Sequence, residues 1–294
     1  MAYKSGFVAL VGRSNVGKST LMNGMIGEKV AIVSPKAQPT RSNLQGVLTR
    51  EGWQAVFIDT PGIHQPRTKL GEHMERQAKQ ALDDVDLAIL VVDAQAGVGE
   101  GDLAILSRLE GRRVPLVVAV NKTDACCEGR TLRSLSAFSG RQVEHVLPIS
   151  AKTGANVEEL VEIIHSYMRE GPQYFPDDMI TDQPERVLAA ELIREKALLL
   201  LNDEVPHGIG VEILSIKPRP EGALLDIHAT IYCEKPSHKR IIIGKNGAVL
   251  REIGTQARVD LERLFGKRVY LNLWVKVQEN WRNRASDLRT LGYE

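Results

Sequence analysis

The segment that most constrains this chain lies close to its start. Residues 7–11 are apolar and of strand length, and they lead into Gly12-Arg13-Ser14-Asn15-Val16-Gly17-Lys18-Ser19-Thr20, after which apolar residues recur as in a helix. From Gly12 to Ser19 the segment matches the pattern G-x-x-x-x-G-K-[ST] in its required strand–loop–helix context. Glycines let a backbone curl around a phosphate, and the N–H groups of such a loop face the anion. We therefore predict a phosphate-binding loop.

Two side chains of this loop have the chemistry that a nucleoside triphosphate needs. Lys18 is expected to reach the β- and γ-phosphates, and the Ser19 hydroxyl to coordinate a Mg²⁺ ion. A chance glycine-rich turn is the alternative, but a chance turn has no need of a strand before it and a helix after it.

The bulk composition is that of an ordinary soluble protein, and its 294 residues suit two domains or one large one. The net charge of +1 is uninformative, but its distribution is uneven. Residues 1–180 hold 20 basic and 21 acidic side chains, whereas residues 235–276 hold ten Lys or Arg and three Asp or Glu. This basic segment predicts a polyanionic partner, with a solvated surface as the alternative.

The cysteines and the N-terminus indicate a reducing, cytoplasmic setting. Cys126, Cys127 and Cys233 have no metal-binding spacing, and an adjacent pair is a poor disulfide framework. The N-terminus runs straight into a strand, so no signal peptide is expected. The longest apolar runs are too short to span a bilayer, which leaves peripheral membrane contact open.

Strands and helices are predicted to alternate through the first 170 residues. Strands are expected over 44–49, 54–58, 87–92, 116–120 and 146–149, helices over 72–82, 103–109, 131–138 and 157–168, and a loop over 34–42. Several of these strands are apolar throughout, which predicts a mostly parallel sheet with helices on both faces. The polar motifs follow the carboxyl ends of strands, where open α/β sheets bind ligands.

A second motif, Asp59-Thr60-Pro61-Gly62, ends one of these strands. Asp59 is expected in the outer shell of the metal, and the Gly62 N–H against the γ-phosphate. Taken alone, the motif could be an ordinary turn. Thr40, in the preceding loop, is predicted to supply a second hydroxyl to Mg²⁺, with Thr49 as an alternative.

A third motif, Asn121-Lys122-Thr123-Asp124, predicts the base. A buried Asp124 carboxylate would accept from guanine N1–H and its exocyclic amine, whereas adenine offers a lone pair there, and unpaired polar groups discriminate strongly. Asn121 is expected to tie this loop to the phosphate loop, and the Lys122 stem to cover the ring. Ser150-Ala151-Lys152 is predicted to back the same base.

These motifs, in this order, make residues 6–170 resemble a translation-factor-class GTPase domain. The resemblance implies GTP and GDP as ligands, Mg²⁺, in-line attack by water, and two loops that order around the γ-phosphate. Lys18, Thr40 and Gly62 are then the residues expected to act on that phosphate. One departure is Ile63, where Ras-like enzymes have a glutamine, so we expect slow hydrolysis. The water would be positioned by backbone, by a partner, or by a potassium ion near Asn15.

The second half begins after a linker over 171–184, which contains Pro172, Pro176 and Pro184. A helix is predicted over 185–201, strands over 209–216 and 223–232, two short helices joined by Gly-x-x-Gly, and a strand over 268–277. The segment Ile242-Ile243-Gly244-Lys245-Asn246-Gly247 before an amphipathic helix resembles a KH domain in its prokaryotic arrangement. Such a loop clamps about four unpaired nucleotides. A helix–turn–helix connection capped by glycine is the alternative.

The resemblance and the basic segment together predict the residues that contact RNA. Ile242, Ile243 and Ile253 are expected to form the floor of a base groove. The full set of expected contacts is Lys239, Arg240, Ile242, Ile243, Gly244, Lys245, Asn246, Gly247 and Arg251.

The predicted organisation is therefore a P-loop α/β GTPase domain over 1–170, the linker, and an α+β type II KH domain over 185–294. The whole chain resembles the Era family of bacterial GTPases, with Ser14 where many members have proline. That family implies a monomeric cytoplasmic protein, loosely associated with the inner face of the membrane, that binds 16S ribosomal RNA near its 3′ end during small-subunit assembly. The alternatives are another ribosome-associated GTPase, or an RNA-binding module whose nucleotide site is only structural.

Overall fold

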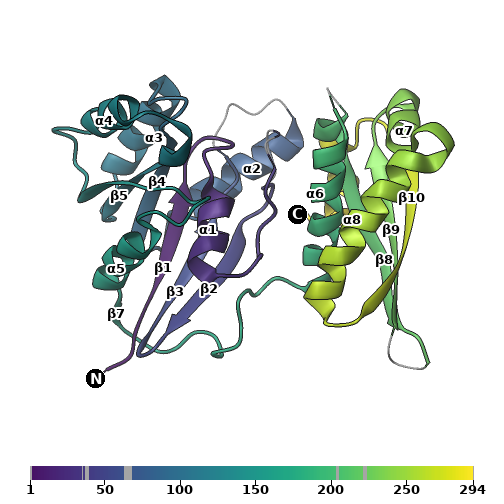
Figure 1. Ribbon diagram of the computed structural model, residues 1–294, viewed down its shortest axis with the longest axis horizontal. Coiled ribbons are helices and arrows are strands. Elements are labelled where there is room, and N and C mark those ends of the chain that lie inside the picture. The colour runs from purple at the N-terminus through teal and green to yellow at the C-terminus, as the bar shows by residue number, and fades with distance from the viewer. Residues whose placement is uncertain are drawn as a thin grey trace. The chain divides into compact units, whose positions relative to one another are not determined.

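A computed structural model describes residues 2–34, 36, 40–62, 68–202, 205–220 and 224–293. The chain divides into two compact units (Figure 1). The first unit contains Met1–Ala31, Thr40–Gln65 and Met74–Asp182, and the second contains Ile32–Pro39, Pro66–His73 and Gln183–Glu294.

The first unit is built on a sheet with the strand order β2-β3-β1-β4-β5-β6, and a short β7 also pairs with β1. All its strand pairs are parallel except β2 with β3 and β7 with β1. The predicted mostly parallel sheet is confirmed, and the antiparallel pair of β2 and β3 lies at one edge. The elements are β1 Lys4–Val11, α1 Lys18–Ile26, β2 Leu44–Arg50, β3 Trp53–Asp59, α2 Lys69–Gln80, β4 Leu87–Asp93, α3 Glu100–Glu110, β5 Leu116–Asn121, α4 Glu128–Ser136, β6 His145–Pro148, α5 Val157–Tyr167 and β7 Arg169–Glu170.

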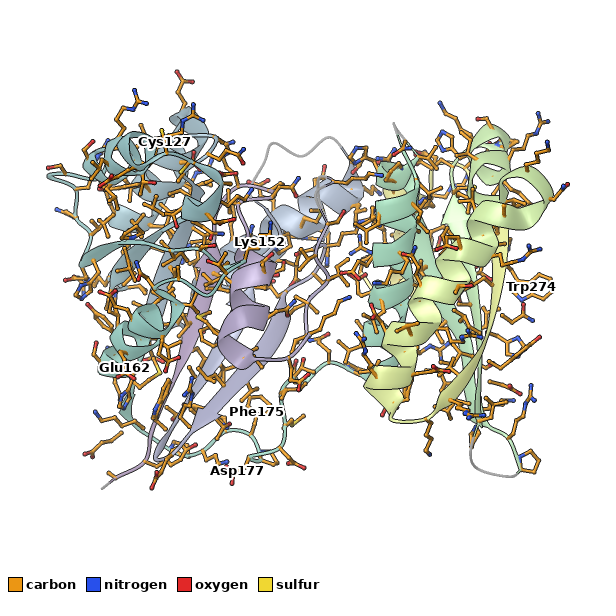
Figure 2. The ribbon with its side chains drawn as sticks, in the orientation of Figure 1. Cys127, Lys152, Glu162, Phe175, Asp177 and Trp274 are labelled. Carbon is orange, nitrogen blue, oxygen red and sulfur yellow. The ribbon has the colours of Figure 1, made fainter. Side chains whose placement is uncertain are left out.

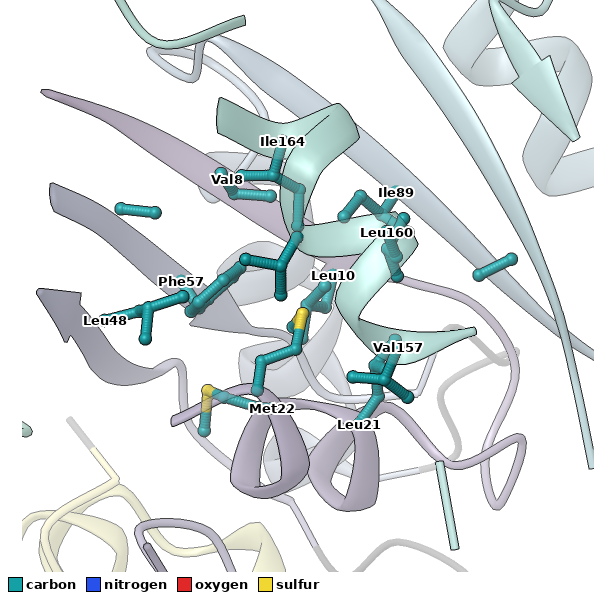
Figure 3. Close-up of a cluster of buried hydrophobic side chains, with 14 of the residues drawn as sticks. Val8, Leu10, Leu21, Met22, Leu48, Phe57, Ile89, Val157, Leu160 and Ile164 are labelled. Carbon is teal, nitrogen blue, oxygen red and sulfur yellow. The ribbon is translucent and has the colours of Figure 1, made fainter. Parts of the chain in front are cut away.

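Helices bury both faces of this sheet, which is why its central strands are apolar throughout. On one face Leu21 of α1 and Leu160 of α5 pack with β-strand residues such as Phe57 (Figure 3). On the other face Ile105 and Leu106 of α3 pack against alternate residues of the same strands. The register places the carboxyl ends of β1, β3, β4 and β5 along one edge of the sheet. That edge is where the sequence motifs lie.

The predicted linker is bound in part to the first unit. The Gln54 side chain, fully buried, accepts hydrogen bonds from the N–H groups of Tyr174 and Phe175, at 3.0 Å each. Further along, Val47 N donates to Ile180 O at 2.8 Å. The two units therefore divide after Asp182, near the end of the 171–184 segment.

The second unit has a three-stranded sheet in the order β10-β9-β8, with β10 parallel and β8 antiparallel to β9. Helices α6 and α8 pack on one face and enclose a separate apolar core. The predicted order α-β-β-α-α-β is confirmed. The elements are α6 Glu185–Leu200, β8 Gly210–Pro218, β9 Leu224–Cys233, α7 Pro236–Ile243, α8 Ala248–Phe265, β10 Arg268–Val277 and α9 Ala285–Thr290.

Two local features of this unit differ from the prediction. Helix α8 has 18 residues and is not short, because its apolar positions continue through Ala257 and Leu261 into the core. After β10, a 3-10 helix at Trp281–Asn283 and helix α9 were not predicted. Trp281 anchors this segment, since its ring is fully buried and its Nε1 donates to Gly208 O at 2.9 Å.

Candidate nucleotide and RNA sites

Glycine is required at both ends of the phosphate-binding loop. Gly12 has φ 149°, and a Cβ there would lie 2.4 Å from Val91 O; Gly17 has φ 104°, and a Cβ would lie 2.2 Å from Asn121 Nδ2. Side chains at these positions would be strained and would also collide with β4 and β5. The loop can therefore pass close to the strand ends, and it delivers Lys18 and Ser19 to the first turn of α1.

Four side chains converge at the predicted metal position. Ser19 Oγ donates to Asp59 Oδ2 at 2.6 Å, Thr40 Oγ1 donates to the same oxygen at 3.2 Å, and the two hydroxyls lie 3.0 Å apart. Thr49 instead accepts a hydrogen bond from Gln54 on the hairpin, so the structure favours Thr40. The fourth side chain, Lys18, donates to the carbonyls of Gly12 and Arg13 at 3.3 and 3.0 Å.

The electrostatics of this cluster fit a divalent cation. Asp59 is fully buried, and among the described residues its Oδ1 has no hydrogen-bond partner. Burial raises the pKa of Asp59, while Lys18 and the two hydroxyls oppose the rise. Burial likewise lowers the pKa of Lys18, against the opposing field of Asp59. A buried carboxylate oxygen without a partner, beside two hydroxyl oxygens, is the kind of donor set that Mg²⁺ takes.

Asn121 joins three loops at the strand ends. Its side chain is buried, its Nδ2 donates to Val16 O at 2.8 Å, and its Oδ1 accepts from Ala151 N at 2.9 Å. The Asn121–Asp124 loop is thereby tied to the phosphate-binding loop, as the sequence predicted, and also to the Ser150-Ala151-Lys152 segment. Thr123 adds a bond from its Oγ1 to Ile149 O at 2.9 Å.

Lys122 and Asp124 surround the position expected for a purine. Lys122 Nζ donates to Asn15 O at 2.7 Å and pairs with Asp93 Oδ2 at 2.6 Å, which fixes its stem beside the loop. Ser150 Oγ donates to Asp124 Oδ1 at 2.6 Å. Asp124 is exposed, so the prediction of a buried carboxylate is wrong for the protein alone. A bound base would have to supply the cover itself.

Two carboxylates in this region were not recognised from the sequence. Asp93, at the end of β4, pairs with Lys122 and also accepts from Gln95 N at 2.8 Å. Asp102, on α3, pairs with Arg13 at 3.1 Å and is almost fully buried. The position of Asp93 at a strand end was a usable signal, whereas nothing in the sequence connects Arg13 with a helix 89 residues later.

The structure brings the predicted nucleotide-site residues together at one edge of the sheet. Thr60 is held against β1 through its Oγ1, which donates to Leu10 O at 2.8 Å, and Gly62 lies against Ser14. Ile63 lies outside the described residues. The residues placed at this edge of the sheet are Gly12, Arg13, Ser14, Asn15, Val16, Gly17, Lys18, Ser19, Thr20, Thr40, Asp59, Thr60, Pro61, Gly62, Asn121, Lys122, Thr123, Asp124, Ser150, Ala151 and Lys152.

The second unit has its own glycine loop, between α7 and α8. Gly244, Asn246 and Gly247 all have positive φ, of 72°, 51° and 76°. A Cβ on Gly244 would lie 2.5 Å from Val249 Cγ2, so the turn has no room for a side chain at this position. Lys245 and Asn246 are exposed at the tip, and Arg240 and Arg251 are exposed on the flanking helices, with Lys239 half-buried. Positively charged side chains and the backbone of the glycine loop therefore lie on one exposed surface.

A groove of about 360 Å³ runs from this loop between α8 and β10. Its walls combine apolar side chains with two arginines. It is lined by Gly247, Leu250, Arg251, Gly254, Thr255, Arg258, Val269, Tyr270, Leu271 and Leu273. Strand β10 is the edge of its sheet, so its outer backbone groups are free of strand partners among the described residues.

The predicted floor of the groove is corrected by this geometry. Ile242 and Ile253 are fully buried in the core of the second unit and cannot contact a ligand, and Ile243 is half-buried. Leu250, Leu271 and Leu273 take the role of the floor. Ile242 lies on α7 and Ile253 on α8, and both side chains point into the core rather than toward the groove.

Together, the fold and the two sites define a class of protein, a P-loop GTPase domain followed by a KH domain. Family models agree, with a 50S ribosome-binding GTPase matching residues 7–122 and a KH domain matching residues 204–282. The chain is 52% identical to GTPase Era of Caldanaerobacter subterraneus subsp. tengcongensis, across 100% of this chain and 99% of that protein. It is 50% identical to GTPase Era of Alkaliphilus metalliredigens across the full length of both. The chain belongs to the Era family of GTPases.

Two solved structures are similar along 99% of both chains, each with a TM-score of 0.95. One, 42% identical, is Era in complex with MgGDPNP and nucleotides 1506-1542 of 16S ribosomal RNA. The other, 43% identical, is a variant of Aquifex aeolicus Era bound to GDP.AlF4-. Among the described residues of this chain, no helix is both long and apolar enough to cross a bilayer.

Proposed function

We propose that this chain is a GTP-hydrolysing switch that binds 16S ribosomal RNA near its 3′ end and acts in assembly of the small ribosomal subunit. The observation that supports it most is the presence of two separately built sites on one chain. One is the phosphate-binding loop beside the buried Asp59 carboxylate, whose Oδ1 has no partner among the described residues. The other is the Gly244–Gly247 loop, which opens onto the α8–β10 groove. The two Era structures above add support, since one holds MgGDPNP with 16S ribosomal RNA and the other holds GDP.AlF4-.

In the nucleotide site each residue has a distinct role. Ser19, Thr40 and Asp59 would hold Mg²⁺, which neutralises the charge that develops on the phosphates when it is bound. Lys18 already spans the loop, and its Nζ would exchange the Gly12 and Arg13 carbonyls for phosphate oxygens. The Gly62 N–H would donate to the γ-phosphate, while Asp124 would accept from the guanine edge. Slow hydrolysis is expected because Ile63 cannot orient water.

In the RNA site, the exposed tip of the glycine loop would pack against the sugar–phosphate backbone. Lys245 and Arg251 supply positive charge, and the loop backbone approaches closely because Gly244 and Gly247 carry no side chain. Bases would lie in the groove against Leu250 and the free edge of β10. The loss of affinity with added salt should then report how many phosphates are contacted.

Contacts inside the second unit support coupling between nucleotide and RNA. Ile32 is buried in the core of that unit, and Val33 N donates to Glu195 Oε1 of α6 at 2.8 Å. Thr40, at the metal position, follows Val33 by seven residues in the sequence. A γ-phosphate that draws in Thr40 would therefore pull on a chain segment held by α6. By linkage, RNA would favour the same nucleotide by the same factor, typically about 5- to 150-fold.

The test is RNA affinity of the full chain with GDP and with a non-hydrolysable GTP analogue, at fixed salt. The RNA is nucleotides 1506-1542 of 16S ribosomal RNA, and tighter binding with the analogue is expected. The double substitution Lys245→Asp with Asn246→Asp places carboxylates where phosphates should lie, so it should abolish RNA binding and leave GDP binding unchanged. Equal RNA affinities in the two nucleotide states would refute the switch.

Three further expectations accompany this function. Potassium near Asn15 is one of the three ways proposed for positioning the water. The chain is expected to be a monomer, and to be cytoplasmic with loose contact to the inner face of the cell membrane.

Another ribosome-associated role would leave GTP hydrolysis intact but shift the RNA preference. A nucleotide site that is only structural would give no turnover with or without ribosomal particles.

A further inference from the structure

In the second unit, α6 and α8 cover one face of the sheet. On the other face the C-terminal segment packs at one end, through Trp281 and Leu291 beside Gly210 and Tyr232, and the part around Trp274 is exposed. Along β10 the odd-numbered residues, such as Leu271 and Leu273, pack on the core beneath α8. The even-numbered residues point the other way, as period-two alternation requires. In Figure 2, Trp274 extends from β10 on the side opposite to α6 and α8. We call this surface the open face. It consists of Glu212, Ser215, Lys217, Asp226, His228, Thr230, Tyr232, Arg268, Tyr270, Asn272, Trp274 and Lys276.

Two large aromatic rings stand exposed on the open face. Trp274 is 56% exposed and Tyr270 is 50% exposed, although the other two tryptophans of the chain, Trp53 and Trp281, are 6% and 0% exposed. Keeping an indole half in water forgoes the apolar burial that the other two achieve. The two rings are four residues apart on one strand, roughly 13 Å, so a single base could not cover both.

The charges around these rings are mainly positive. Lys217, Arg219, Arg268 and Lys276 stand against three carboxylates, Asp226 and Glu212 on the strands and Asp287 of α9, which lies beside Tyr232 and Lys276. All three are engaged, and Asp287 accepts from Gln278 Nε2 at 3.2 Å. Asp226 pairs with Arg219 at 2.9 Å, and Glu212 accepts a hydrogen bond from Tyr232 at 2.7 Å. The Arg219 guanidinium also lies 5.2 Å from the Tyr270 ring centre, and Lys276 Nζ lies 5.8 Å from that of Tyr232. Among the described residues, no carboxylate forms an ion pair with Lys217, Arg268 or Lys276.

From this arrangement we propose that the open face is a second RNA surface, on which unpaired bases stack on Trp274 and Tyr270. Stacking on exposed rings beside cations is how proteins hold single strands without reading their sequence. A sheet that presents aromatic side chains can hold two or three bases in this way. The proposal rests on the proposed function, because the strand that stacks here is the continuation of the one in the groove.

The groove and the open face are continuous at Tyr270. Its side chain lines the groove and also belongs to the even-numbered row of β10. An RNA strand leaving the groove can therefore cross the free edge of β10 and reach Trp274 without leaving the protein. A protein partner would have to match Lys217, Arg268 and Lys276 with carboxylates, whereas a nucleic acid supplies a phosphate for each nucleotide. The charge therefore favours RNA as the occupant.

The experiment uses the full chain with the GTP analogue and two kinds of probe. The long probe is nucleotides 1506-1542 of 16S ribosomal RNA, and the short probes are fragments of about four nucleotides tiled along it, which fill only the groove. Trp274→Ala should weaken the long probe roughly 5- to 150-fold, the usual loss of one stacked base. It should leave the short probes unchanged. Trp274→Phe keeps an aromatic ring and should recover most of the affinity.

Trp274 also reports directly, because it is the exposed tryptophan. The long probe should quench its fluorescence and shield it from iodide, and the short probes should not. The matched control is Val259→Ala on α8, which removes an apolar side chain that is 44% exposed and away from the open face. Thermal unfolding should be the same in all variants, since neither side chain is buried.

Each alternative outcome overturns the proposal in a different way. RNA does not reach this face if Trp274→Ala binds the long probe with wild-type affinity and the long probe does not quench Trp274 in the wild-type chain. Unchanged RNA affinity with lost binding to small-subunit particles means that a protein covers it. If the double substitution at Lys245 and Asn246 also left RNA binding intact, the glycine loop itself would be misassigned and the proposed function would fail first.

Discussion

Removing the Asn121 amide should separate the loops that form the nucleotide site. In Asn121→Ala, Val16 O loses its donor at 2.8 Å and Ala151 N loses its acceptor at 2.9 Å. Both bonds are buried, and a buried backbone group without a partner costs about 1–3 kcal/mol. The free protein can relieve this cost by letting the two loops part and take up water. Nucleotide binding must then bring them back together.

The expected effect therefore falls on affinity more than on stability. If binding bears the cost of both groups at the low end, GDP affinity should drop by about 2 kcal/mol, which is roughly 30-fold. Thermal unfolding of the nucleotide-free protein should change little. The assay is titration with a fluorescent GDP analogue, alongside thermal unfolding of the same samples.

The matched control is Asn156→Gly. Asn156 also donates its amide to a carbonyl, Pro148 O at 2.8 Å, but this bond is exposed. Its φ of 57° suits glycine, so the backbone should be undisturbed. GDP affinity of the control should stay within about threefold of wild type. If Asn121→Ala also stayed within that margin, the argument that Asn121 holds the site together would be refuted.

Two other substitutions test neighbouring parts of the site. Asp124→Asn should weaken GTP binding and improve binding of xanthosine triphosphate, whose C2 carbonyl can accept from the new amide; full GTP affinity in the variant would show that Asp124 does not read the base. Gly62→Ala would place a Cβ 2.4 Å from Ser14 Oγ and 2.7 Å from Ser14 N, so the two loops must part. Single-turnover hydrolysis should fall by about tenfold or more while GDP binding persists, in contrast to Gly129→Ala, whose Cβ would meet nothing within 4 Å. Normal hydrolysis by Gly62→Ala would mean that Gly62 need not approach Ser14.

Much of the fold and of the nucleotide site could be predicted because its signals are local. Glycine spacing in the phosphate-binding loop, apolar runs of strand length, and polar residues directly after them all lie within a few positions of one another. Parallel strands end at one edge, so motifs at strand ends had to meet there. Gly244 and Gly247 are a local signal of the same kind, because the tight turn there needs positive φ angles, which glycine adopts readily.

Other features depended on which distant segments the fold brings together. Of the two candidate threonines for the metal position, Thr40 contacts Asp59 at the carboxyl end of β3, whereas Thr49 bonds to Gln54 in the β2–β3 hairpin. The fold therefore selects Thr40. The Arg13–Asp102 pair joins residues 89 positions apart. Residue spacing in the sequence cannot predict this contact, because it depends on the order of the strands in the sheet.

The direction in which a side chain points was likewise decided by packing. The sequence by itself determined that Ile242 belongs to a helix, and that residues 268–277 alternate as a strand. Only the tertiary structure decided that Ile242 is buried and that Trp274 is exposed. Periodicity defines two faces of an element but not which of them is covered. The cover comes from helices α6 and α8, which pack on one side of the sheet, whereas Trp274 lies on the other side.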